Sequence, residues 1–145
     1  MAKDALFLVL KLAKEAEEKA SLQFRSAQMN HQKSRTQLDT LNNYRLDYMK
    51  QMGDKVGSNL TASHYQQFHQ FIGQIDSAIS QQVHAVQQAK QHEQQQQQLW
   101  LEKQQKRKAV ATLLDKKAQR KQAAESKAEQ KMLDEFAVQQ FYRNR

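Results

Sequence analysis

The chain has 145 residues, of which 39% are apolar, and it contains neither cysteine nor proline. This low apolar content argues against a compact globule with a deep core, and it leaves a long helical hairpin or a disordered chain. Without cysteine the chain has no disulfide and no thiolate metal site, which fits a reducing cytosol. The formal net charge is +8, and residues 99–145 hold 12 basic and 6 acidic residues. This basic region could meet an acidic partner or a phosphate backbone, or it is a solvated helix face.

No segment of the sequence predicts a membrane span. The longest apolar run, residues 5–10, is far shorter than the roughly 20 residues that a spanning helix needs. The neighbouring Asp4 and Lys11 also do not match a secretory signal peptide. We therefore expect a cytoplasmic protein.

The first predicted helix covers residues 4–52, with Asp4 as its N-cap. Along it, apolar residues recur at alternating spacings of three and four, which is the signature of a coiled coil. Most of this first seam is apolar, and polar residues within a seam often set the register of a coiled coil. The seam comprises Leu6, Leu10, Ala13, Glu17, Ala20, Phe24, Ala27, His31, Ser34, Leu38, Leu41, Arg45, Tyr48 and Met52.

A turn is predicted at residues 53–62, where Gly53 and Gly57 fall in a polar stretch. The second predicted helix covers residues 63–142, with Thr61 or Ser63 as its N-cap. Its strong seam comprises Tyr65, Phe68, Ile72, Ile75, Ile79, Gln82, Val86 and Ala89. No seam position is expected in the run from residue 94 to 98. Weaker periodicity follows at Trp100, Val110, Leu114, Ala124 and Ala128.

The short turn predicts that the two helices fold back on each other. Counting from the turn pairs Leu41 with Ile75 and Leu6 with Val110. The part of the second helix beyond about residue 115 would then lack a partner within the chain and be free to fray. The predicted fold is all-α, a single domain over residues 1–145 built as a long antiparallel two-helix coiled-coil hairpin with a longer second helix.

No residues form a recognisable catalytic, cofactor-binding or metal-binding motif. The three glycines are too few and wrongly spaced for a phosphate-binding loop. None of the five histidines forms an i, i+4 pair with another, as a helical metal site would need. We therefore predict a protein that is not an enzyme and uses neither a cofactor nor a small-molecule substrate.

Each helix carries a stripe of four residues at the spacing i, i+4, i+7 and i+11, near the turn. Antiparallel pairing would join the two stripes into an aromatic and aliphatic patch. Such a patch could close the hairpin, or it could bind a partner, since Tyr and Phe are enriched in interfaces. The paired stripes are Gln37, Leu41, Tyr44 and Tyr48, with Phe71, Ile75, Ala78 and Gln82.

Three segments of this chain, with its size, basic charge and hairpin layout, are similar to one known family. The segments are Gln37–Tyr48, Tyr65–Phe68 and Lys131–Ala137. Across essentially the whole chain, the pattern resembles FliJ, a family of small cytoplasmic coiled-coil proteins in the bacterial flagellar type III export apparatus.

The resemblance implies a hairpin like the central stalk of rotary ATPases, which promotes assembly of the hexameric export ATPase FliI. It also implies contact with the gate protein FlhA, escort of export chaperones, and peripheral association with the cell membrane at the flagellar base. The family's gate-contacting surface falls on the paired stripes. At the position of Gln82, other members can carry histidine.

On the same resemblance, the basic residues of the second helix would meet acidic loops of the ATPase ring. We call them the basic segment: Lys103, Lys106, Arg107, Lys108, Lys116, Lys117, Arg120 and Lys121. The alternatives are a generic coiled-coil adaptor and a nucleic-acid-binding coiled coil. Nucleic acid is not the expected partner, because these cations lack the layout of a dimeric basic region and do not alternate with aromatic residues.

Overall fold

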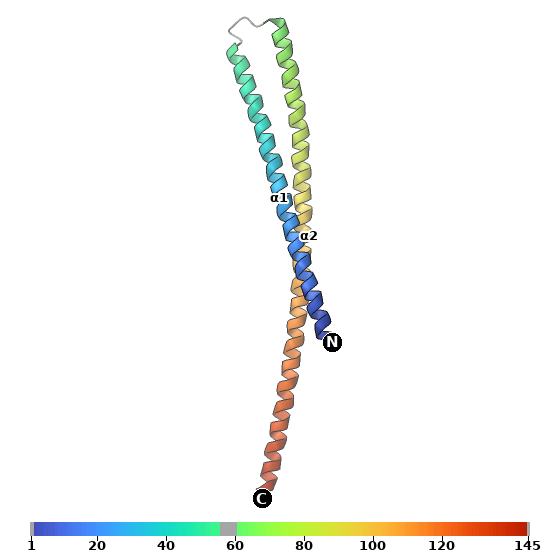
Figure 1. Ribbon diagram of the computed structural model, residues 1–145. Coiled ribbons are helices and arrows are strands. Elements are labelled where there is room, and N and C mark those ends of the chain that lie inside the picture. The colour runs from blue at the N-terminus through green and yellow to red at the C-terminus, as the bar shows by residue number, and fades with distance from the viewer. Residues whose placement is uncertain (1, 56–60, 145) are drawn as a thin grey trace. The chain divides into compact units, whose positions relative to one another are not determined.

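The computed structural model describes residues 2–55 and 61–144, with side chains from residue 5 onward. Figure 1 shows two uninterrupted helices, α1 (Ala2–Lys55, 54 residues) and α2 (Ala62–Arg143, 82 residues). The described residues contain no strand. The absence of proline permits helices of this length, because no ring interrupts the backbone hydrogen bonds. The predicted all-α fold with a longer second helix is confirmed.

The helix ends differ from the prediction by a few residues. Helix α1 begins at Ala2, so Asp4 lies inside the helix and the prediction that it is the N-cap is wrong. The same helix continues through Gly53 to Lys55, because a glycine near a helix end costs little when no proline follows. Gly57, the other predicted turn residue, lies outside the described residues.

Of the two predicted N-caps of α2, Thr61 has this role. Its Oγ1 accepts a hydrogen bond from the backbone N–H of His64, at 3.3 Å. This bond satisfies one of the four N–H groups that a helix leaves unpaired at its start. Ser63 is already helical, since α2 begins at Ala62.

The chain divides into two units, and each pairs a segment of α1 with a segment of α2. The terminal unit comprises residues 1–18 and 102–145, and the central unit comprises residues 19–101. In the central unit Phe24 stacks on Trp100 and Tyr48 on Phe68, so the two helices run antiparallel. The predicted antiparallel hairpin is confirmed by this order of contacts.

The predicted seam of α1 is the face of this helix that packs against α2. All its fourteen members are buried or half-buried, whereas only two other described side chains of α1 are not exposed. The most buried members, Ala13, Ala20 and Ala27, recur every seven residues, and Ala27 is only 2% exposed. Small side chains at these positions let the second helix approach closely, which produces a tightly packed contact from little apolar area.

The polar members of this seam all meet polar groups of α2. Two of these partners are carboxylates, one is a guanidinium and one is an amide, so each polar residue of α1 faces a complementary group. Such pairs favour one register, because a shifted register would leave them unpaired in the seam. The four pairs are Glu17 with Arg107, His31 with Glu93, the carbonyl of Ser34 with Gln82, and Arg45 with Asp76.

The predicted seam of α2 is confirmed from Phe68 to Ala89, where every member is buried or half-buried. Its first predicted member, Tyr65, is exposed, and this prediction is wrong. Tyr65 lies in the first turn of α2, and its ring packs on His69 of the same helix with the ring centroids 4.4 Å apart.

The run from residue 94 to 98 does contribute to the seam, contrary to the prediction. Gln96 is half-buried and continues the alternating spacing from Glu93 to Trp100. A helix keeps one side toward its neighbour whatever residues occupy it, so a polar run can occupy seam positions. Ala124 and Ala128, where the weaker periodicity continues beyond residue 115, are both exposed.

The expected pairing of Leu41 with Ile75 fits the ring contact of Tyr44 with Phe71, about one turn away on each helix. Both Leu41 and Ile75 also lie on the packed faces.

The expected pairing of Leu6 with Val110 stays a prediction. Phe7, the next residue, lines a pocket with Leu114 and Ala118, whereas Val9 lines another pocket with Lys106, so the two pockets lie on either side of the expected count. The prediction assumed a constant count from the turn. In a coiled coil, each seam residue instead inserts among four residues from neighbouring turns of the facing helix.

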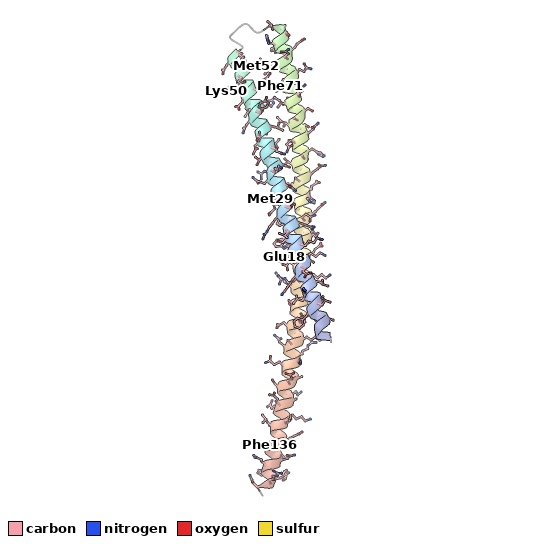
Figure 2. The ribbon with its side chains drawn as sticks, in the orientation of Figure 1. Glu18, Met29, Lys50, Met52, Phe71 and Phe136 are labelled. Carbon is pink, nitrogen blue, oxygen red and sulfur yellow. The ribbon has the colours of Figure 1, made fainter. Side chains whose placement is uncertain are left out.

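Beyond residue 114, every described side chain of α2 is exposed. Phe136, labelled in Figure 2, lies in this stretch, and its side chain is exposed. The helix nevertheless continues to Arg143 without a break. Neither helix, over its described residues, has a stretch long and apolar enough to cross a membrane.

Candidate interaction surfaces

Four aromatic rings gather in the central unit, two from each helix. Tyr48 lies against both phenylalanines of α2, with ring centroids 5.5 Å from Phe68 and 4.6 Å from Phe71. The ring of Tyr44 meets Phe71 edge-on at 6.1 Å. Phe71 is labelled in Figure 2. Aromatic pairs at these distances are favourable beyond the area that they bury, so the cluster holds the two helices together.

The structure joins the two predicted stripes into one patch. Besides the ring contacts, the side-chain amide of Gln82 donates to the side-chain oxygen of Gln37 at 3.3 Å. Within the patch, Ile75 is only 6% exposed and belongs to the core, whereas Gln37 and Tyr44 are exposed. The half-buried members are Leu41, Tyr48, Phe71, Ala78 and Gln82. The patch is therefore part core and part surface, with Tyr44 as its largest exposed side chain at 52%.

An ion pair beside the paired stripes was not predicted. The Nε of Arg45 donates to Asp76 at 2.6 Å, and this hydrogen bond raises the pKa of Arg45. The available signal was an arginine in the α1 seam, which needs an acceptor on the facing helix. Asp76 follows Ile75 directly, so it lies at the edge of the packed face of α2.

The basic segment lies on α2 in the terminal unit. Lys103 and Arg107 are half-buried, and the other six members are exposed. Arg107 has a partner within the chain, because its Nε and Nη2 donate to the two carboxylate oxygens of Glu17 at 2.6 and 3.4 Å. The hydrogen bond from Arg107 holds the pKa of Glu17 below its usual value. Arg107 therefore mainly stabilises the contact between the two helices. The exposed charge of the basic segment is carried by its lysines and Arg120.

Among the described residues, no group of three or more His, Asp or Glu side chains is placed to hold a metal ion. The features that the two helices do assemble are an aromatic patch and a charged surface. Both are typical of protein–protein contacts, in which aromatic anchors supply area and charges steer the encounter.

Two comparisons with known proteins point to the same family. The family model described as "Flagellar FliJ protein" matches residues 2–145. The Flagellar FliJ proteins of Escherichia coli (strain K12) and Salmonella typhi are 28% and 29% identical over 106 residues, which is 73% of this chain and 72% of each relative. No solved structure gives a significant match. Because the family model extends over both helices and the segment between them, this chain belongs to the FliJ family of flagellar proteins.

Proposed function

We propose that this chain is a non-catalytic component of the flagellar type III export apparatus that binds other components through two separate surfaces. The observation that carries the proposal is the family match across residues 2–145, on a two-helix hairpin whose paired stripes adjoin. The chain would act in the cytoplasm, at the inner face of the membrane, through its partners.

The first surface is the patch formed by the paired stripes, and its proposed partner is the gate protein FlhA. Tyr44 presents an exposed ring next to a fixed neighbour, Phe71, so little side-chain freedom is lost when a partner covers it. Gln37 adds an exposed amide beside it. Ile75 would support the patch from beneath rather than touch the partner, because it is buried.

The second surface is the exposed part of the basic segment, and its proposed partner is the ring of the export ATPase FliI. Six of its cations are exposed on one helix. Charges of one sign on a surface attract an acidic partner over about 10 Å at moderate salt and so speed its encounter. Escort of export chaperones would be a further role of the same chain.

Binding of FlhA tests the first surface. In Tyr44→Ala the exposed ring is lost, and we expect affinity for purified FlhA to fall by about tenfold or more, as for an aromatic hot spot. Tyr65→Ala is the matched control, since Tyr65 is 57% exposed but lies outside the paired stripes. If both variants bind FlhA equally well, the patch is not part of the FlhA interface. If the wild type does not bind FlhA, the result favours the alternative of a generic coiled-coil adaptor.

Nucleic acid is the second candidate partner for the exposed cations. Here the expected result is weak binding of duplex DNA that vanishes at physiological salt, as for non-specific contacts with phosphates. Tight binding that persists at physiological salt would favour this alternative over the ATPase ring.

A further inference from the structure

The terminal unit contains an apolar groove that neither helix fills. On the α1 side it is lined by Val9, Leu12, Ala13 and Ala16, and on the α2 side by two lysines, 103 and 106. Its volume is about 300 Å³. Val9 and Leu12 are both exposed, although they are large aliphatic residues.

Apart from Ala13, which belongs to the seam, the apolar residues of the groove form a stripe beside the seam. Val9, Leu12 and Ala16 are spaced at i, i+3 and i+7, so they lie on one face of α1. The neighbouring seam residues Leu10 and Ala13 already pack against α2. Helix α1 therefore shows a second apolar face with the spacing that a further helix would need in order to pack there.

The charges at the groove are of one sign. Its charged lining residues are Lys103 and Lys106, while Arg107 nearby is paired with Glu17. Lysine stems can extend along apolar surface with their ammonium groups at the rim, where they attract carboxylates. A neighbouring depression on α1 differs, because it is lined by two lysines and two glutamates: Lys11, Lys14, Glu15 and Glu18.

We propose that this groove binds an acidic amphipathic α-helix of another protein, which packs beside α1 and α2 as a third helix. Leucine-like side chains of that helix would cover Val9, Leu12 and Ala16, and its Asp or Glu residues would meet Lys103 and Lys106. This inference goes beyond the proposed role, which uses the exposed charges of the basic segment and no apolar groove.

A second copy of the chain fits the groove less well. Its exposed C-terminal segment, residues 122–143, carries four acidic and three basic residues and so offers little net charge to the lysines. The basic excess of residues 99–121 would also oppose the approach of two terminal units.

Binding of designed peptides to the full chain tests the proposal. The probes are fluorescent helical peptides of about 20 residues, with Leu at the seam positions of each heptad and Glu beside them. We expect saturable binding, seen as a rise in fluorescence anisotropy. We also expect about tenfold weaker binding by Leu12→Gln and by Lys106→Glu, through loss of apolar contact and of charge complementarity.

The controls match these changes in exposure and charge. Leu12 and Leu22 are 54% and 57% exposed, so Leu22→Gln removes an equally exposed leucine from the central unit. Lys50→Glu reverses an exposed charge in the same unit, at a residue labelled in Figure 2. Both controls should bind the peptides as the wild type does. All four sites are on the surface, so the helical circular dichroism should not change.

Three results would overturn the proposal. One is that no acidic peptide binds, and another is that peptides with Lys in place of Glu bind equally well. The third is self-association of the wild type, measured by analytical ultracentrifugation, that Leu12→Gln abolishes, which would make a second copy the occupant. None of these results bears on the FlhA contact, and the FliI contact is tested separately at Lys116 and Arg120, which lie outside the groove.

Discussion

At the scale of single residues, the polar members of the seam explain the register of the hairpin. A slip of one heptad changes the apolar contacts little. It would, however, leave a carboxylate in the seam without its guanidinium partner, which costs free energy. Glu17 and Arg107 make two hydrogen bonds, and His31 meets Glu93 through one on the seam of the central unit. We infer that these pairs select the alignment and that the alanines and aromatic rings then stabilise it.

The Glu17–Arg107 pair predicts a dependence of stability on pH. The pKa of Glu17 is lowered in the folded chain, mainly by the hydrogen bond from Arg107. The carboxylate therefore stabilises the fold above the unfolded value of 4.5, and this contribution is lost as the pH falls through the lower folded pKa. We expect Glu17→Gln to unfold at a lower temperature than the wild type at neutral pH, and the difference to shrink at an acid pH below the folded pKa of Glu17.

Thermal unfolding followed by circular dichroism measures this difference. Glu129→Gln serves as the control, since it removes an exposed carboxylate from the last third of α2. It should leave the unfolding temperature unchanged at both pH values. A Glu17→Gln variant whose deficit is the same at both pH values would contradict the role given to the ion pair.

At the scale of the helices, α1 is packed through alanine where the seam is most buried. Ala20 and Ala27 leave little room for a larger residue, because they are only 3% and 2% exposed. We expect Ala27→Leu to lower the free energy of unfolding by about 1–3 kcal/mol, as overpacking does. In Ala123→Leu the same change is made at an exposed helical position and should be nearly neutral. Urea denaturation of the two variants measures the difference, and equal stability would mean that the helices are not in close contact at Ala27.

Of the two glycines that the structure describes, Gly73 is the one in the middle of a helix. A Cβ built on it meets no atom within 4 Å, so no close contact explains why glycine is there. We expect Gly73→Ala to stabilise the chain by about 0.5–1 kcal/mol, because alanine loses less backbone freedom in a helix. Gly53→Ala, near the end of α1, should have a smaller effect. A loss of stability in Gly73→Ala, measured by urea denaturation, would show that the helix bends or opens at this residue.

The sequence predicts the helices well because their signals are local. The alternating spacing in α1 identifies all fourteen seam residues correctly, since one turn of helix determines which side chains share a face. The spacing fails on α2 at Gln96, because a polar seam residue gives no hydrophobic signal. It also does not predict ion pairs such as Glu17 with Arg107, because the pairing of distant residues depends on which side chains meet across the two helices.

The candidate surfaces are predictable to a similar extent. Spacing alone brings the paired stripes to one place, and the contacts of Tyr44 with Phe71 and of Gln37 with Gln82 confirm that they adjoin. Spacing alone cannot predict that Ile75 is buried and Tyr44 is exposed, because both lie within about one helical position of the seam. Exposure depends on how closely the second helix packs at each turn, and a periodic pattern does not contain that information.

At the scale of the whole molecule, the account rests on two surfaces that belong to different units. The paired stripes lie in the central unit, and the basic segment lies in the terminal unit. Their chemistry also differs, since one is aromatic and partly buried and the other is cationic and mostly exposed. Changes to one surface should therefore leave the other intact, because sites without shared partners act independently.

The ATPase activity of the cognate FliI tests this claim most directly. We would measure it with the wild type, with Tyr44→Ala and with Lys116→Glu/Arg120→Glu, which reverses two exposed charges outside the apolar groove. Lys127→Glu/Lys131→Glu is the control, with the same charge change at exposed positions further along α2. The account predicts that the wild type, Tyr44→Ala and the control raise the ATPase rate equally. It also predicts that Lys116→Glu/Arg120→Glu raises the rate less, most clearly at low salt. A wild-type chain that leaves the ATPase rate unchanged would contradict the account.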